Sequence, residues 1–128
     1  MGLDMYAYAI KAEELKDSAQ QTDLETSNDA PEEIAYWRKH GALHNWFNEL
    51  YNSKGGTDPD FNTSDVRVEL EDLDQLEMQV TMNQLVWVGG FFFGEDASEE
   101  YKSDDLAFIA KAREEINAGN VVYYTSWW

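Results

Sequence analysis

The sequence predicts a single compact α+β domain over residues 1–128, in which a small β-sheet packs against about three helices. Short apolar runs rich in aromatic and β-branched residues stand near both ends of the chain, which is typical of strands. Between them, three segments place apolar residues near helical spacing, and glycines mark several of their boundaries. A chain of this length with 43 % apolar residues can bury its own core, and without Cys it has no disulfide or thiolate metal site.

The N-terminal strand is expected at residues 4–10, where Tyr6 and Tyr8 alternate with Met5 and Ala7. Both faces of this strand are largely apolar, so we expect it in the centre of the sheet together with the C-terminal strand. The segment that follows, KAEELKDSAQ, is expected to form a short helix and then to give way to a polar loop.

A long helix is expected from residue 31 to about residue 52. A capping residue at 27–29, Pro31 in the first turn and two glutamates after it match a helix start, and Gly55 lies beyond the end. The remaining elements, in order, are a strand or helix lead at 66–70, a helix at 71–83, a buried strand or tight loop at 85–94, an acidic linker at 95–105, a helix capped by Ser103 and ended by Gly119, and a closing strand at 121–128.

The stretch AYWRKHGALHNWF, residues 35–47, gathers both histidines and two adjacent cations on an acidic chain. On a regular helix His40 and His44 share one flank, whereas Arg38 points nearly the opposite way. His44 either bonds a backbone group or serves as an acid, a base or an anion donor. The two histidines could also bind zinc with a distant carboxylate, although Gly41 stands where metalloproteases have Glu. Four aromatic residues either pack in the core or, for the two tryptophans, stack on a flat ligand: Tyr36, Trp37, Trp46 and Phe47.

The segment DPDFNTSDVRVE, residues 58–69, has oxygen-bearing side chains at alternate positions and Glu69 at the twelfth, as in an EF-hand loop. Thr63 replaces the glycine that such a loop needs at its sixth position, Pro59 holds the second, and a β-like run follows. Asp and Asn also belong in ordinary turns, so we expect a loop without an ion.

Charge excludes some functions. The chain has 26 Asp and Glu against nine Lys and Arg, a formal net charge of −17. This balance argues against binding nucleic acid or anionic membranes through the general surface. It is consistent with a merely solvated surface, with a basic partner or DNA mimicry, or with cation binding. The first residues lack a basic n-region, no apolar run is long enough to span a membrane, and Cys is absent, so a cytoplasmic location is expected.

Four segments together resemble one protein family: GLDMY, AYWRKHGALHNWF, GGFFFG and YYTSWW. They are similar to a family of small proteins from tailed bacteriophages and some bacterial genomes, and the resemblance runs from Gly2 to Trp127. It implies a protein that acts on a host system, in the host cytoplasm, but no particular reaction or cofactor. His40 is not part of the pattern. The positions that match are Asp4, Tyr36, Trp37, Arg38, Lys39, His44, Trp46, Gly94, Ser126 and Trp127.

This pattern suggests one geometry. Asp4 opens the first strand and Ser126 lies near the end of the last, so neighbouring strands would bring both to one end of the sheet. Asp4 would then either orient His44 or pair with Arg38. The two terminal tryptophans are unusual for a solvated end, and we expect them to dock on the same chain or on a second subunit of a homo-oligomer.

Three functions are consistent with these residues. In the first, the protein binds a small anionic ligand, such as a nucleotide or a phosphorylated metabolite. In the second, it is an acidic inhibitor or DNA mimic that binds a host protein through carboxylates at 69–77 and 95–105. In the third, it is a small hydrolase or transferase with His44 as base, Asp4 orienting it and Ser126 as a weaker nucleophile candidate. The candidate ligand-binding residues are Arg38, Lys39, Trp37, Trp46, Tyr36 and Trp127.

Overall fold

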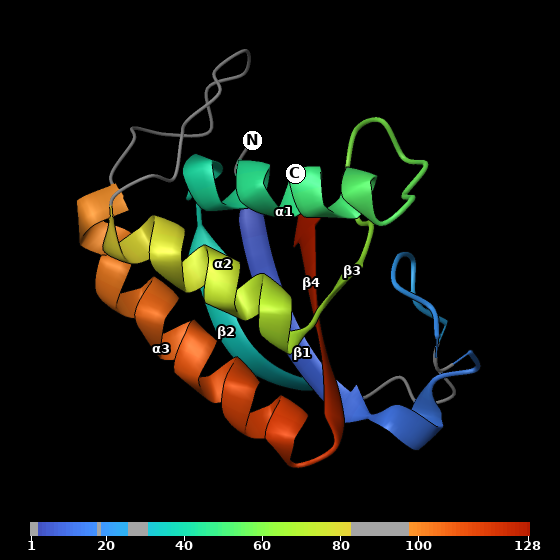
Figure 1. The fold of residues 1–128 in the computed structure, drawn as a ribbon. Helices are drawn as coiled ribbons and strands as arrows, with labels where there is room; N and C mark the ends of the chain where they lie inside the picture. The colour runs from blue at the N-terminus through green and yellow to red at the C-terminus, as the bar shows by residue number, and fades with distance from the viewer. Residues whose placement is uncertain (1–2, 18, 26–30, 83–97) are drawn as a thin grey trace.

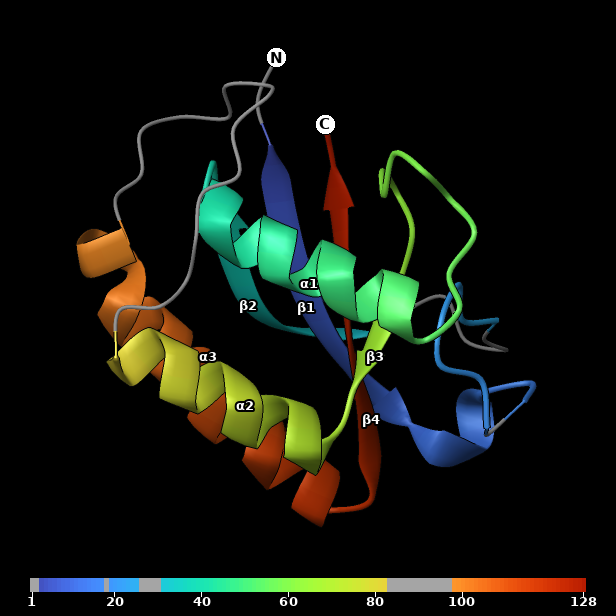
Figure 2. The ribbon, with the colours of Figure 1, turned by 45° about the horizontal axis from the view of Figure 1, so that its top comes forward.

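The computed structural model of the chain describes residues 3–17, 19–25, 31–82 and 98–128. It confirms the α+β prediction, because in these residues four antiparallel strands form one sheet and three helices pack on one side of it (Figure 1, Figure 2). The strands are β1 (Asp4–Lys11), β2 (Glu32–Arg38), β3 (Val66–Val68) and β4 (Asn120–Trp127), in the order β2-β1-β4-β3. The helices are α1 (Gly41–Ser53), α2 (Leu70–Thr81) and α3 (Ser98–Asn117).

The two terminal strands are the central ones, as predicted. They pair along their whole length, from Asp4 opposite Trp127 to Lys11 opposite Asn120. Alternation sends Met5, Ala7 and Ala9 of β1 toward the helices, where these side chains are buried. The strand end that holds Asp4 therefore lies beside the strand end that holds Ser126, as the sequence suggested.

The core lies between this sheet face and the three helices. Its largest fully buried side chains are aromatic, and Phe47 of α1 stacks on Tyr124 of β4 with 3.9 Å between the ring centroids. Phe61, from the loop after α1, lies 5.8 Å from the Tyr124 ring, and Phe108 of α3 packs edge-on against Phe47. Burying each such ring stabilises the fold by about 1.5–3 kcal/mol. This aromatic layer fixes α1 and α3 on the central strands.

The predicted helix from residue 31 to 52 is wrong in its first part, because residues 32–38 form the edge strand β2 and the helix begins at Gly41. Pairing with β1 holds residues 32–38 in an extended conformation, and this tertiary contact outweighs the local helix signals. Lys39, at the corner between β2 and α1, has a positive φ of 60°, which no helix residue adopts.

Other elements differ from the prediction in type or in their bounds. The short helix expected after β1 is a single 3-10 turn, Ala12–Glu14, and α3 begins at Ser98 rather than after Ser103. The strand at 66–70 stops at Val68, because Glu69 and Asp72 form a capping box that starts α2. Gly119 ends α3 with φ 94°, as predicted. The expected strand or loop at 85–94 lies outside the described residues.

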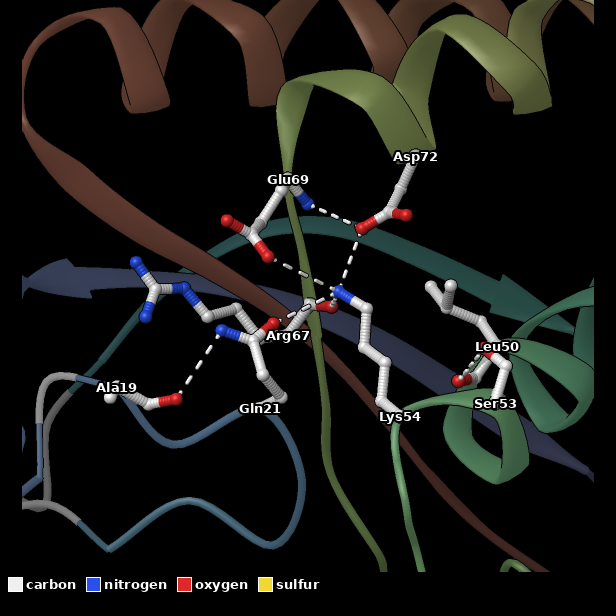
Figure 3. Close-up of polar contacts among 8 residues, drawn as sticks. All are labelled: Ala19, Gln21, Leu50, Ser53, Lys54, Arg67, Glu69 and Asp72. Carbon is white, nitrogen blue, oxygen red and sulfur yellow. Dashed lines mark hydrogen bonds and ion pairs between the residues drawn. The ribbon is translucent and has the colours of Figure 1, made fainter.

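Lys54, just after α1, joins four segments of the fold (Figure 3). Its ammonium group donates to Asp72 at 2.7 Å, to the Arg67 carbonyl at 2.7 Å and to the Gln21 amide oxygen at 3.1 Å, with Glu69 at 3.7 Å. These contacts use all three donors of the ammonium group, and the side chain is only 13 % exposed.

Replacing Lys54 by Met should therefore lower the free energy of unfolding by about 1–3 kcal/mol, because the half-buried Asp72 and the Arg67 carbonyl lose their charged donor. Urea denaturation followed by circular dichroism measures the change. Lys11→Met, which removes the same charge from an exposed side chain, is the matched control and should change stability by less than about 0.5 kcal/mol. Equal effects of the two changes would contradict the role given to Lys54.

Candidate functional site

The sheet face turned away from the helices carries polar and aromatic side chains, which lie in rows across neighbouring strands. The strand register places Arg38, Asp4 and Trp127 side by side across β2, β1 and β4. The next row on the same face holds Tyr36, Tyr6 and Thr125. Asp4, Tyr6, Tyr36, Arg38 and Trp127 are called the open-face cluster below, because they lie at the end of this face that no described segment covers.

Asp4 lies at the centre of the open-face cluster. The Tyr36 hydroxyl donates to its Oδ1 atom at 2.7 Å, and the Arg38 Nε atom lies 3.8 Å from the same oxygen. The predicted pairing of Asp4 with Arg38 is thus present, as a long and exposed ion pair of small energy. The bond to the Asp4 carboxylate raises the pKa of the Tyr36 hydroxyl, so this group stays protonated and donates at neutral pH.

The cluster presents two aromatic surfaces to solvent. The Trp127 side chain is 70 % exposed and that of Tyr36 is 49 % exposed. The Tyr6 ring packs against the Tyr36 ring, with 5.3 Å between the ring centroids. Arg38, whose side chain is 64 % exposed, completes a surface with flat rings, a guanidinium group and a carboxylate. Such a surface can stack on a planar ring, neutralise an anionic group and accept a hydrogen bond.

The other end of this sheet face is covered by the segment after β1. Leu15 is buried against Ile10, Val121 and Tyr123, with Leu24 packed beside them. Tyr8, next to Tyr123 in this region, lies 5.6 Å from its ring. The described part of this segment thus covers one end of the face, and the open-face cluster lies at the other end with exposed side chains.

His44 and Ser126 lie on the helix side of the sheet, so the structure does not bring them to Asp4. His44 is 6 % exposed, and its Nδ1 atom lies 2.7 Å from the Tyr124 hydroxyl. Burial lowers the pKa of His44 to about 4, so it is neutral at pH 7 and a weak base. Ser126 is buried, with its hydroxyl 3.4 Å from the Phe61 carbonyl. This arrangement does not place the proposed base and its orienting carboxylate together.

Two of the tryptophans expected to stack on a ligand are core residues. Trp37 is buried against Phe108, and Trp46 is buried against Phe47. Neither ring presents a face to solvent. Lys39 is exposed at the corner after β2, where its backbone N–H donates to the Leu3 carbonyl.

The two histidines do not share a site. His40 precedes α1, and its Nε2 atom lies 2.9 Å from Asp105 of α3. No group of three or more His, Asp and Glu side chains in the described ranges could hold a metal ion. The loop after α1 is closed by its own bonds, since Asp58 accepts from the backbone of Asn62 and the hydroxyl of Ser64. Glu69, at the twelfth position of this segment, lies 3.7 Å from the Lys54 ammonium group.

The terminal tryptophans behave differently from each other. Trp128 docks on its own chain, where its backbone N–H donates to the Asn62 side chain at 3.0 Å and its carbonyl accepts from the same side chain at 2.6 Å. This docking confirms half of the expectation for the C-terminus. It also fixes the preceding residue, Trp127, with its ring turned to solvent.

Sequence reasoning missed Tyr6 and Asp105. Tyr6 could have been found, because the alternation of β1 that places Asp4 on one face places Tyr6 on the same face. Asp105 is one of many carboxylates, and no local signal distinguishes it.

Comparison of the chain with protein-family models, with curated proteins and with solved structures gives no match. In the part of the chain that the structure describes, no helix combines the length and the apolar character needed to cross a membrane. The function is therefore argued from the geometry of the site.

Proposed function

We propose that the protein binds a small ligand that combines a flat ring with an anionic group, such as a nucleotide or a phosphorylated metabolite, at the open-face cluster. The observation that carries this proposal is the exposure of Trp127, Tyr36 and Arg38 on one uncovered end of the sheet. The family resemblance adds a setting in the cytoplasm of a bacterial host.

Three members of the cluster contact the ligand in this proposal. The register puts Arg38 and Trp127 on either side of Asp4, two strand spacings or about 10 Å apart. Trp127 stacks on the planar ring of the ligand, while Arg38 binds its anionic group. Asp4 keeps lone pairs beyond those used by Tyr36, and these accept from an amino or hydroxyl group of the ligand. A nucleotide carries all three features. A reaction based on His44 is not included, because that side chain is buried on the other side of the sheet.

The test is a titration of the protein with AMP, ADP, ATP, cyclic AMP, sugar phosphates and inorganic phosphate, monitored by tryptophan fluorescence and isothermal calorimetry. We expect a nucleotide to bind and to quench Trp127. Trp127→Ala should weaken that binding by about 1–3 kcal/mol, the usual loss of one stacking contact. Arg38→Gln should weaken it by about tenfold and reduce its dependence on salt.

Lys111→Gln is the matched control, because it removes one positive charge from α3, away from the open-face cluster. It should leave the affinity within about twofold of that of the unchanged protein. Equal losses in Arg38→Gln and Lys111→Gln would show a general charge effect and contradict the proposal. So would the absence of binding by every compound in the series.

A further inference from the structure

β2 is the edge strand of the sheet next to α3. The Lys39 N–H donates to the Leu3 carbonyl at 2.8 Å, so these two residues form a hydrogen-bonded pair. Antiparallel alternation then turns the main-chain groups of Arg38 and Tyr36 away from β1, toward the outer edge. The Arg38 carbonyl confirms this direction, because it accepts from the Tyr101 hydroxyl of α3 at 2.7 Å. The main-chain N–H and C=O of Tyr36 face the same way, so this edge presents a donor and an acceptor with which an added strand could pair.

Two hollows lie beside this edge, between β2 and α3, and together they are called the groove below. Its larger part has a volume of about 390 Å³. Only two charged side chains line it, Asp104 and Lys111. Lys111 is already paired on its own helix, with Glu115 at 3.6 Å. The apolar lining consists of Ile34, Ala35, Trp37, Ala107 and Phe108.

The groove changes character toward the end of α3. A second hollow of about 220 Å³ lies there, lined by Glu32 of β2 and Glu115 of α3 together with Glu14 and Lys11. The Lys111–Glu115 ion pair connects the two hollows along one helix face, since these residues are four apart. One end of the groove thus has several apolar residues with one charge of each sign, and the other is lined by three carboxylates against one lysine.

We propose that this edge and groove bind an extended basic peptide of a partner protein, which adds a fifth strand beside β2. Main-chain bonds to Tyr36 would hold the strand, and alternate side chains would enter the groove. An apolar side chain fits the larger hollow. A Lys or Arg side chain two to four positions away meets Glu32 and Glu115, because three strand residues span about 10 Å. This site is independent of the open-face cluster, although Tyr36 contributes its ring to one and its main chain to the other.

The charge of the whole chain supports the same partner. A formal charge of −17 attracts a basic segment and repels an acidic one, so association should weaken as salt is added. A second copy of this chain carries the same negative charge and is a poorer occupant of the groove.

The experiment compares two short fluorescein-labelled peptides by fluorescence anisotropy. The first, GSTITKTKS, places one isoleucine two and four positions before its lysines, and the second, GSTITETES, carries glutamates instead. We expect the basic peptide to bind and the acidic one to bind at least about tenfold more weakly. Hydrogen exchange of the Tyr36 amide should slow when the basic peptide is bound, because that N–H becomes paired.

Two variants of α3 make the test specific. Ala107→Arg fills the larger hollow and should weaken binding of the basic peptide by at least about tenfold. Ala110→Arg adds the same charge at an exposed position of the same helix and should leave binding within about twofold. Both original side chains are exposed, so both variants should fold, which circular dichroism checks. Equal effects of the two variants, equal binding of the two peptides, or an unchanged Tyr36 amide would overturn the proposal.

Discussion

Asp105→Ala is expected to lower the free energy of unfolding by about 3–5 kcal/mol, a large fraction of the stability of a small domain. Asp105 of α3 is 1 % exposed and joins two other elements. One carboxylate oxygen accepts from the indole N–H of Trp37 at 3.0 Å, and the other lies 2.9 Å from His40 Nε2. The His40 ring also stacks on Tyr101, with 4.2 Å between the centroids.

The size of the effect follows from burial. Removing the carboxylate leaves the indole N–H and the imidazole nitrogen without their partner in the interior, and each such group costs about 1–3 kcal/mol. Burial already raises the pKa of Asp105, while the bonds from His40 and Trp37 act in the opposite direction. The network therefore stabilises the fold through its complete set of bonds and through the way it positions α3 against the end of β2.

Guanidinium denaturation measures the loss, and Asp104→Ala is the control. Asp104 is the neighbouring carboxylate on the same helix but is exposed, so its removal should change stability by less than about 0.5 kcal/mol. Asp105→Asn keeps an acceptor for Trp37 and should lose less than Asp105→Ala. A double-mutant cycle with His40→Ala should give a coupling energy of about 1–3 kcal/mol. Additive losses in that cycle would show that His40 and Asp105 act separately.

The sequence predicted the central strands well because their signal is local. In β1 the alternation is regular, and small or unbranched side chains on one face leave room for the helices. β2 was missed because its pattern is broken. A register shift between Ala7 and Tyr8 inserts Ile34 as an extra residue, so that Glu33 and Tyr36 fall on one face despite their odd spacing. Such a segment has no clear period of two, and its proline and glutamates then favoured a helix.

The helix predicted for residues 32–38 also gave a wrong grouping of the candidate site residues. Asp4, Tyr36, Arg38 and Trp127 were all identified from the sequence, and the structure brings these four together. They were grouped with Trp37 and other residues of a supposed helix. A strand turns successive side chains by 180° rather than 100°, so Tyr36 and Arg38 face solvent while Trp37 enters the core. The grouping of the candidate site residues thus depends on whether residues 32–38 form a strand or a helix. Only the pairing with β1 decides between the two.

Two buried groups are expected to give this protein opposite dependences of stability on pH. Burial lowers the pKa of His44 from its ordinary 6.5 to about 4. Burial raises the pKa of Asp65 from its ordinary 3.8 to about 6, and the nearby charge of Asp23 adds to this shift, while a bond from Thr125 opposes it. Each shift corresponds to a free energy on the order of 3 kcal/mol.

The two contributions change with pH in opposite directions because burial disfavours the charged form of each group. His44 is charged when protonated, whereas Asp65 is charged when deprotonated. Between about pH 4 and 6.5 the unfolded chain binds a proton at His44 that the folded chain does not, so this contribution to stability is lost as the pH falls. Between about pH 3.8 and 6 the folded chain binds a proton at Asp65 that the unfolded chain does not. That contribution is present at low pH and is lost as the pH rises through 6. In the unchanged protein the two contributions largely cancel between pH 4 and 6.

Single substitutions should separate the two effects. Relative to the unchanged protein, Asp65→Asn should gain stability on going from pH 4 to pH 7, and His44→Gln should lose stability over the same range. Each difference should approach 3 kcal/mol, with a slope of at most about 1.4 kcal/mol per pH unit. Urea denaturation at intervals across this range measures both. The many other carboxylates contribute the same background to every variant, and Asp104→Asn checks that an exposed carboxylate leaves the profile parallel. Profiles that shift in the same direction for Asp65→Asn and His44→Gln would rule out the opposing pair, since groups whose pKa values shift in opposite directions on folding tilt the curve in opposite senses.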